Sequence, residues 1–150
     1  MKTSGEMMEY DTGAHRDSEK GKPRIDLIPN SFFELLLSSK LSQDSLVLLY
    51  QIRDSFSNRQ KDLQAFLDDV MSVITHMYGS PHEALLDLGN RLAEGAEKYG
   101  ANNWEKGFPH DRVFRSFERH YVMYGAGMTD EDHKGAVLFN LMVLVHYHHV

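Results

Sequence analysis

The stretch "SPHEALLDLGNRLAEGAEKYG", residues 80–100, carries the start, the apolar face and the end of one α-helix. Ser80 suits the N-cap, Pro81 is accepted in the first helical turn, and Glu83 completes a capping box. Apolar residues recur every three or four positions along one side, and Gly100 follows the last of them. Comparable spacing recurs elsewhere in the chain, and no stretch reads convincingly as a strand. We therefore expect an all-α fold, a compact bundle of four to six helices.

The composition is that of a globular chain. It has 150 residues, 41% of them hydrophobic, so we expect one domain over residues 21–150 behind a polar, flexible N-terminus of residues 1–20. The net charge of −6 argues against a nucleic-acid polymer as partner, and the lack of cysteine excludes disulfides, zinc–thiolate sites and cysteine nucleophiles. The N-terminus lacks the apolar core of a signal peptide, and the longest apolar run, residues 136–145, is shorter than the ~20 residues that span a bilayer. We expect a cytoplasmic protein with no membrane contact.

That apolar run belongs to the last predicted helix, which extends from about residue 130 to residue 146. The run "AVLFNLMVLV" is apolar on all sides, so it should be buried by the rest of the chain or by a partner chain. Asn140 lies in its middle, where a buried amide needs hydrogen-bond partners.

Two clusters of acidic residues are candidates for a metal site. Glu94 and Glu97 are three positions apart on a helix and can hold one hard divalent cation between them, although a solvated helix face is the commoner role of such a pair. The run from Asp130 to His133 can supply carboxylate and imidazole ligands, or it can merely favour the helix dipole. His120, on an aromatic-rich helix, is either a ligand or a hydrogen-bonded core residue.

Scattered cations and aromatic residues suit a nucleotide if the fold gathers them. Lys22, Arg24, Lys98, Arg115 and Arg119 would bind a polyphosphate when they lie together, and are surface charges otherwise. Tyr99 and Trp104 offer rings on which a base can stack, although Trp104 is equally suited to anchoring its loop.

Four segments in order carry a family resemblance: "GKPRIDLIP", "LAEGAEKYGANNWEKG", "ERH" and "DEDHKGAVLFN". They resemble the phage dATP/dGTP diphosphohydrolase family, the MazZ-like members of the all-α, MazG-like nucleotide pyrophosphohydrolases, over residues 21–29 and about 84–147. The resemblance implies a homo-oligomer, a dimer or tetramer, in the host bacterial cytoplasm. It implies hydrolysis of a deoxynucleoside triphosphate between the α and β phosphates, with Mg²⁺ or Mn²⁺ as cofactor. In phages that replace adenine with 2-aminoadenine, such an enzyme makes dGMP from dGTP and removes dATP.

Carried over by position, the resemblance assigns roles to individual residues. Glu94 and Glu97 resemble the E-x-x-E of the metal helix, as ligands and as catalytic residues. "DHKGAVLFN" lines up with the MazG-type "EELGDLLFQ", which puts Asp132 and His133 on its two glutamates and Ala136 where a ligand is expected. The second half of the metal site must therefore be built differently, with His120, Asp132, His133 or Asn140. The expected substrate-binding residues are Lys22, Arg24, Lys98, Tyr99, Asn102, Asn103, Trp104, Arg119 and Asn140.

One departure and two alternatives remain. Residues 31–79 form an extra helical segment relative to the family. The chain can instead be a non-catalytic, helical nucleotide-binding or oligomeric module, which the missing ligand at Ala136 favours. It can also be a general house-cleaning pyrophosphohydrolase that acts on damaged or pyrimidine nucleotides.

Overall fold

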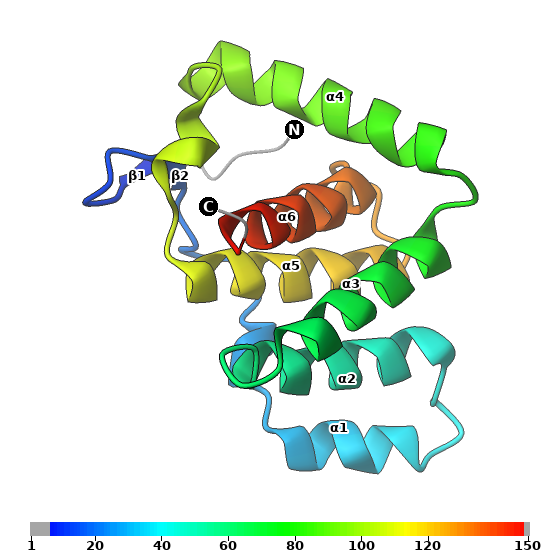
Figure 1. Ribbon diagram of the computed structural model, residues 1–150. Coiled ribbons are helices and arrows are strands. Elements are labelled where there is room, and N and C mark those ends of the chain that lie inside the picture. Colours follow the sequence, from blue (N-terminus) through cyan, green and yellow to red (C-terminus); the bar gives the residue numbers. More distant parts are fainter. Residues whose placement is uncertain (1–6, 149–150) are drawn as a thin grey trace. The chain divides into compact units, whose positions relative to one another are not determined.

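The computed structural model describes residues 7–148, and six α-helices make up most of them (Figure 1). The prediction of an all-α fold with four to six helices is confirmed. The helices are α1 (Asn30–Leu37), α2 (Asp44–Ser57), α3 (Leu63–Met77), α4 (Pro81–Tyr99), α5 (His110–Gly125) and α6 (His133–Tyr147). Two short 3-10 helices, η1 (Ile25–Leu27) and η2 (Asn103–Lys106), lie in the connections.

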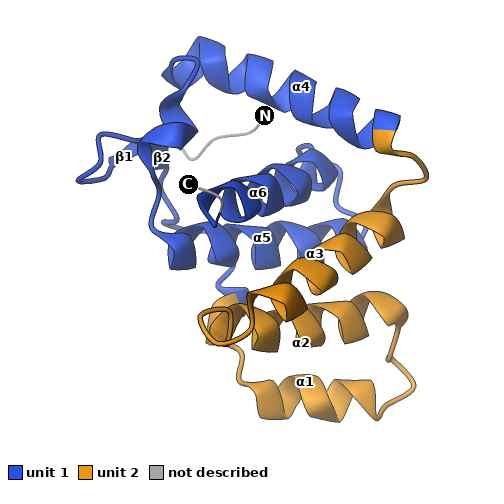
Figure 2. Ribbon diagram, viewed as in Figure 1, with its two compact units in different colours: residues 1–25, 82–150 blue, residues 26–81 orange. Residues whose placement is uncertain are grey.

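The chain divides into two units (Figure 2). Unit 1 takes in residues 1–25 and 82–150, of which 7–25 and 82–148 are described, and unit 2 takes in residues 26–81. The extra helical segment that the sequence singled out, residues 31–79, falls within unit 2. A single catalytic domain over residues 21–150 stays a prediction.

Unit 2 consists of α1, α2 and α3 around a small apolar core. Its fully or nearly buried side chains are Phe33, Leu49, Ile52, Phe56, Phe66, Val70 and Val73. Asp62 begins α3 as a true N-cap, because its carboxylate accepts a hydrogen bond from the Ala65 amide at 3.1 Å.

The core of unit 1 is the packing of α5 against α6. Val113 and Phe117 of α5, and Leu141 and Leu144 of α6, have no exposed surface. Nine of the fifteen residues of α6 are buried, which agrees with the burial expected for this apolar helix. The helix begins at His133 rather than near residue 130, because Asp132 caps it.

A two-stranded hairpin precedes the helices, and it corrects the expectation that the chain has no strand. Strands β1 (Met7–Glu9) and β2 (His15–Asp17) pair antiparallel, and Gly13 takes the positive φ of 84° that their turn requires. Ala14 has no exposed surface. Of the N-terminus predicted to be flexible, residues 7–17 form this hairpin, and residues 1–6 lie outside the described part. Strands of three residues are too short to show alternation in the sequence.

Helix α4 is the least covered helix of unit 1. None of its nineteen residues is buried, and Leu85 and Leu86 are 65% and 69% exposed. Gly100 follows with a φ of 96°, as expected of the glycine that ends a helix. Among the described residues, no helix has the length and apolar character that crossing a bilayer requires.

Candidate functional site

A pocket in unit 1 lies between the hairpin, one face of α4, the η2 loop and α5. It encloses about 770 Å³ of space outside the atoms, part of which is open solvent. Its polar lining residues are His15, Arg16, Asp17, Lys22, Arg91, Asn103, Arg112, Ser116, Arg119, His120 and Glu131. Its aromatic lining residues are Tyr99, Trp104, Phe108 and Phe139.

Asn103 fastens the hairpin to the η2 loop. Its Oδ1 accepts from the His15 amide and its Nδ2 donates to the His15 carbonyl, each at 2.9 Å. Asn103 is 6% exposed. Its amide group satisfies both backbone hydrogen-bonding groups of His15, as a neighbouring strand would. Strand β2 therefore brings Arg16 and Asp17 to the pocket.

Asp17 ties the same strand to the end of α4. Its Oδ1 accepts hydrogen bonds from Lys98 Nζ at 2.7 Å and from Tyr99 Oη at 2.6 Å. Partial burial would raise the pKa of Asp17, but the bonds from Lys98 and Tyr99 outweigh it and lower that pKa below its usual value. Asp17 is therefore a carboxylate at neutral pH, and we call this arrangement the Asp17 clamp.

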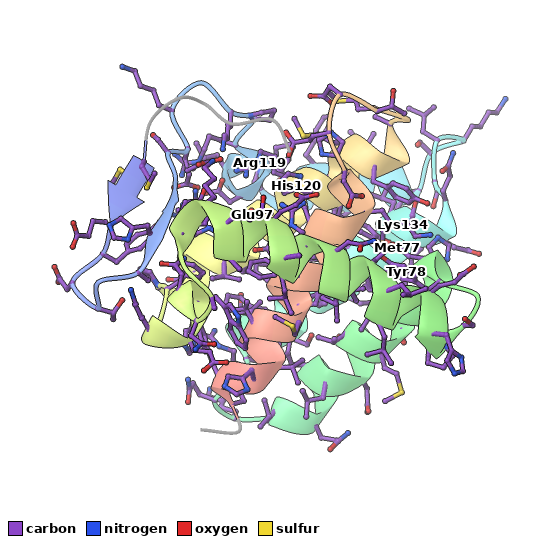
Figure 3. All side chains as sticks on the ribbon, turned by 90° about the horizontal axis from the view of Figure 1, so that it is seen from above. Met77, Tyr78, Glu97, Arg119, His120 and Lys134 are labelled. Atoms are coloured by element: carbon purple, nitrogen blue, oxygen red, sulfur yellow. The ribbon has the colours of Figure 1, made fainter. Side chains whose placement is uncertain are left out.

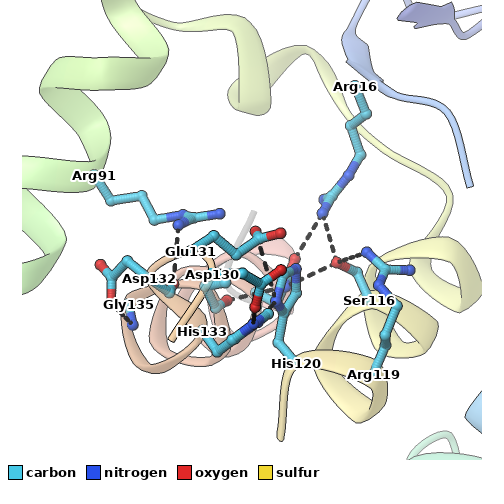
Figure 4. A network of polar contacts seen from close by, with 12 residues as sticks. Arg16, Arg91, Ser116, Arg119, His120, Asp130, Glu131, Asp132, His133 and Gly135 are labelled. Atoms are coloured by element: carbon cyan, nitrogen blue, oxygen red, sulfur yellow. Dashed lines mark hydrogen bonds and ion pairs between the residues drawn. The ribbon is translucent and has the colours of Figure 1, made fainter. Parts of the chain in front are cut away.

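Ser116 lies at the centre of a polar network on the pocket floor (Figure 4). Its Oγ accepts from Arg16 Nη2 at 3.1 Å and from Arg119 Nη2 at 3.3 Å. Asn140 donates to the same oxygen at 3.2 Å, and its Oδ1 accepts from Arg16 Nη2 at 3.0 Å. The buried amide of Asn140 is thus used to hold Arg16 in place.

A candidate metal centre borders the pocket, at the end of α5 and the start of α6. His120, Glu131 and His133 each offer a ligand atom, and these atoms lie within 4.8 Å of one another. The two Nδ1 atoms of His120 and His133 are 2.9 Å apart, and Glu131 Oε1 is 4.0 Å from His120 Nδ1. Among the described residues, these three side chains form the cluster that could hold a metal ion.

Neighbouring groups orient both imidazoles. His133 Nε2 lies 2.8 Å from Asp130 Oδ1; a carboxylate only accepts, so this nitrogen carries a proton and donates it to Asp130. Burial first, and then the charges of Arg119 and Arg91, lower the pKa of His120 to about 2. His120 is therefore a neutral imidazole over the whole physiological range.

The structure separates the predicted metal ligands into two groups. His120 and His133 come together with Glu131, which belonged to the acidic run considered as a source of ligands but was not among the residues that the family resemblance assigned. Asp132 instead caps α6, accepting from the Gly135 amide at 3.0 Å, and its carbonyl accepts from Arg91. The sequence could have indicated this role, because aspartate is among the residues preferred at the N-cap.

Glu94 and Glu97 do not join this cluster. Both are exposed on α4, and the face of that helix that lines the pocket consists of Arg91, Leu92, Gly95, Ala96 and Tyr99. Figure 3 labels Glu97 on α4, and Arg119 and His120 on α5. Ala136, where the family pattern leads one to expect a ligand, has no exposed surface. The roles given to Glu94 and Glu97 stay predictions.

The predicted substrate-binding residues are also divided. Lys22, Tyr99, Asn103, Trp104 and Arg119 line the pocket. The other four, Arg24, Lys98, Asn102 and Asn140, are not part of its lining. Lys98 belongs to the Asp17 clamp and Asn140 holds Arg16, so both act on residues of the pocket rather than in it.

Sequence reasoning missed three cations of the pocket, Arg16, Arg91 and Arg112. Arg112 had a signal, because it lies seven positions before Arg119 and therefore on the same face of α5. Arg16 had none, since it reaches the pocket only through the pairing of its hairpin with Asn103.

Residues 66–150 match the family described as dATP/dGTP diphosphohydrolase, N-terminal. The chain belongs to this family. The match covers more than half of the chain and includes α4, α5, α6 and the metal cluster, and it confirms the resemblance to the dATP/dGTP diphosphohydrolases. The hairpin and the segment "GKPRIDLIP" lie before the matched residues. Comparison with curated proteins gave no match, and neither did comparison with solved structures.

Proposed function

We propose that this member of the dATP/dGTP diphosphohydrolase family is a cation-dependent enzyme that cleaves dGTP, and also dATP, between the α and β phosphates. The products are the deoxynucleoside monophosphate and pyrophosphate. One observation carries the proposal: the cluster of His120, Glu131 and His133 opens on a pocket that is rich in cations and aromatic rings. A triphosphate needs such positive charge, and a purine suits such rings.

The cluster fits a divalent cation, and its donors favour Mn²⁺ over Mg²⁺. Two imidazole nitrogens and one carboxylate suit transition metals, whereas Mg²⁺ prefers oxygen ligands alone. The 2.9 Å between the two Nδ1 atoms is close to the ~3.0 Å between neighbouring ligands of an octahedral ion with bonds of about 2.1 Å. A bound cation would supply charge neutralisation at the phosphates and activation of water.

The chain's own residues position this centre. Asp130 orients His133 by accepting from its Nε2, so Nδ1 faces the cluster. Arg91 reaches from α4 and donates to the Asp132 carbonyl at 3.3 Å, which steadies the turn that presents Glu131 (Figure 4). Tyr147 of α6 holds the backbone of Trp104, because its Oη donates to the Trp104 carbonyl at 2.7 Å. The Trp104 ring lines the pocket and packs edge-on against His146, and we propose that it also contacts the base.

The catalytic role of Glu94 and Glu97 is a separate part of the proposal. Both carboxylates lie on the helix whose opposite side lines the pocket. If Glu97 accepts a proton during turnover, alanine at this position removes activity and leaves binding of Mn²⁺ intact. Full turnover in that variant would exclude the role.

We also propose that the protein works as a homo-oligomer. Support comes from α4, which has no buried residue and exposes Leu85 and Leu86. Apolar side chains that protrude together from a helix are typical of a surface covered by a partner.

Product analysis tests the proposed function. The protein is incubated with each of the eight common ribo- and deoxynucleoside triphosphates, with Mn²⁺ or Mg²⁺, and the products are separated. We expect monophosphate and pyrophosphate from dGTP and dATP, no turnover with chelator, and a higher rate with Mn²⁺; dGMP formation would fit the synthesis of 2-aminoadenine nucleotides in phages. Diphosphate and orthophosphate would mean that a different bond is cleaved.

Two further outcomes would favour the alternatives. Preference for pyrimidine substrates would point to a house-cleaning pyrophosphohydrolase. Binding of nucleotide without turnover of any substrate would point to a non-catalytic module.

A further inference from the structure

The pocket carries more positive than negative charge, although the chain as a whole is acidic. Five cationic side chains line it, and they are Arg16, Lys22, Arg91, Arg112 and Arg119. Only two of its lining residues are carboxylates, Asp17 and Glu131. The Asp17 carboxylate already accepts from Lys98, outside the lining. The imbalance indicates a ligand with several negative charges.

Two of the arginines have unused donors. Arg112 is 5% exposed; its Nε lies 3.3 Å from Glu19 Oε2 and its Nη2 donates to the Asp17 carbonyl at 2.8 Å. Its Nη1, and likewise Nη1 of Arg16, is buried and has no hydrogen-bond partner among the described residues. Buried donors without a partner are rare in native proteins, and a bound ion is one common reason for them.

The arginines are also held in position in advance. Arg16 and Arg119 both donate to Ser116 Oγ, a neutral oxygen that cannot balance two guanidinium charges. Arg16 also donates to Oδ1 of the buried Asn140. Its Cζ lies 4.8 Å from the centre of the Phe108 ring. Groups that are ordered before binding lose little entropy when a ligand arrives.

Burial and neighbouring positive charges lower the pKa values of two cationic groups of the pocket. Burial first, and then the charge of Arg112, lower the pKa of Arg16 to about 9. Burial and the charge of Arg119 lower the pKa of Lys22. An anion between these groups would stabilise their charged forms and so raise both pKa values.

We propose that Arg16, Arg112 and Arg119 form an oligophosphate subsite that binds the β and γ phosphates of the substrate, and therefore inorganic pyrophosphate, without the divalent cation. Guanidinium forks pair with phosphate oxygens through two parallel hydrogen bonds, which matches the unused Nη1 donors of Arg16 and Arg112. The identity of the substrate rests on the proposed function, whereas binding of pyrophosphate does not.

Calorimetric titration with inorganic pyrophosphate in the presence of chelator tests the subsite. Arg112→Gln is compared with Arg115→Gln, a matched control on the same helix. Arg115 also pairs with Glu19, through Nε at 3.0 Å and Nη2 at 2.9 Å, but it does not line the pocket. Both variants weaken the contact with Glu19. Arg112→Gln also loses the hydrogen bond to the Asp17 carbonyl, and of the two variants it alone removes a donor of the subsite.

We expect wild type to bind pyrophosphate without metal, and Arg112→Gln to bind it roughly tenfold or more weakly, as for the loss of a charge-assisted hydrogen bond. Arg115→Gln should change the affinity less than threefold. If Arg112→Gln does not fold, Arg16→Lys serves instead, because it keeps the charge and removes the fork; we expect a similar loss.

Two results would overturn the subsite: no metal-free binding of pyrophosphate by wild type, or equal losses in Arg112→Gln and Arg115→Gln. Either of them, together with normal dGTP turnover, would leave the proposed function standing. Arginine-dependent binding of pyrophosphate without turnover of any nucleotide would instead support the subsite and remove the proposed function.

Discussion

Substitution of Asn103 by alanine tests how the hairpin is held against the pocket. The change removes both hydrogen bonds to His15, each 2.9 Å long, and leaves the amide and the carbonyl of that residue without this partner. A hydrogen bond contributes a net ~0.5–1.5 kcal/mol, so the loss of two should reduce the free energy of opening of the hairpin by about 1–3 kcal/mol. Because β2 carries Arg16, binding of pyrophosphate should weaken as well.

Hydrogen exchange followed by mass spectrometry measures this effect where it occurs. Peptides that cover residues 7–17 should exchange faster in Asn103→Ala, by roughly 5–150-fold for ~1–3 kcal/mol. Peptides from α2 in unit 2 should not change. The matched control is Asn102→Ala, because Asn102 is exposed, does not cap η2 with its side chain and does not line the pocket.

Asn102 and Asn103 are adjacent in the sequence, but only Asn103 bonds to His15. If Asn103→Ala keeps the wild-type exchange of residues 7–17 and still loses turnover, Asn103 contacts substrate and the anchoring argument is refuted. If Asn102→Ala opens the hairpin as strongly as Asn103→Ala, the two hydrogen bonds to His15 are not what holds it.

Three further predictions concern the metal, acid stability and assembly. His133→Ala should weaken binding of Mn²⁺ by more than the ~10–100-fold that loss of an outer-shell partner costs. Glu97→Gln should leave the Mn²⁺ affinity unchanged in the same titration. Equal losses in the two variants would place α4 in the metal site. Asp17→Asn should lower the melting temperature at pH 7, and should lower it by less at pH 3. A carboxyl whose pKa is lowered by folding stabilises the protein above its unfolded pKa of ~3.9 and loses that contribution as the pH falls. A difference in melting temperature that does not shrink in acid would contradict the Asp17 clamp. Leu85→Gln should shift the mass measured by light scattering towards the monomer, since covering a leucine contributes ~1.5–3 kcal/mol per copy. Leu41 of unit 2 is similarly exposed, and Leu41→Gln should not change the mass. An unchanged mass for Leu85→Gln would exclude α4 from the interface.

The helices and the metal region show how far local patterns reach. Helix α4 could be bounded from its capping residues and its final glycine, and α6 could be expected to be buried because it is apolar on all sides. These features depend on residues three or four positions apart, which a linear pattern records directly. The hairpin escaped notice because its strands have three residues each and are fastened by Asn103, 88 positions along the chain from His15.

Within the metal region, residue types were readable but roles were not. Acidic and imidazole side chains near residue 130 were visible, yet the turn before α6 assigns the cap to Asp132 and the cluster to Glu131. Glu131 and Asp132 both precede the first helical residue, so helical periodicity does not fix which way their side chains face; the turn itself decides it.

The all-α fold and the family of this protein follow from spacing and motif, because these are local properties of the chain. The pocket itself depends on tertiary contacts: a hairpin from one end of the chain meets α5 and the loop after α4, and the Ser116 network aligns arginines about 100 residues apart. Bringing together residues that far apart costs chain entropy, which tertiary packing such as that of α5 against α6 must offset, so the folded structure establishes which cations share one site.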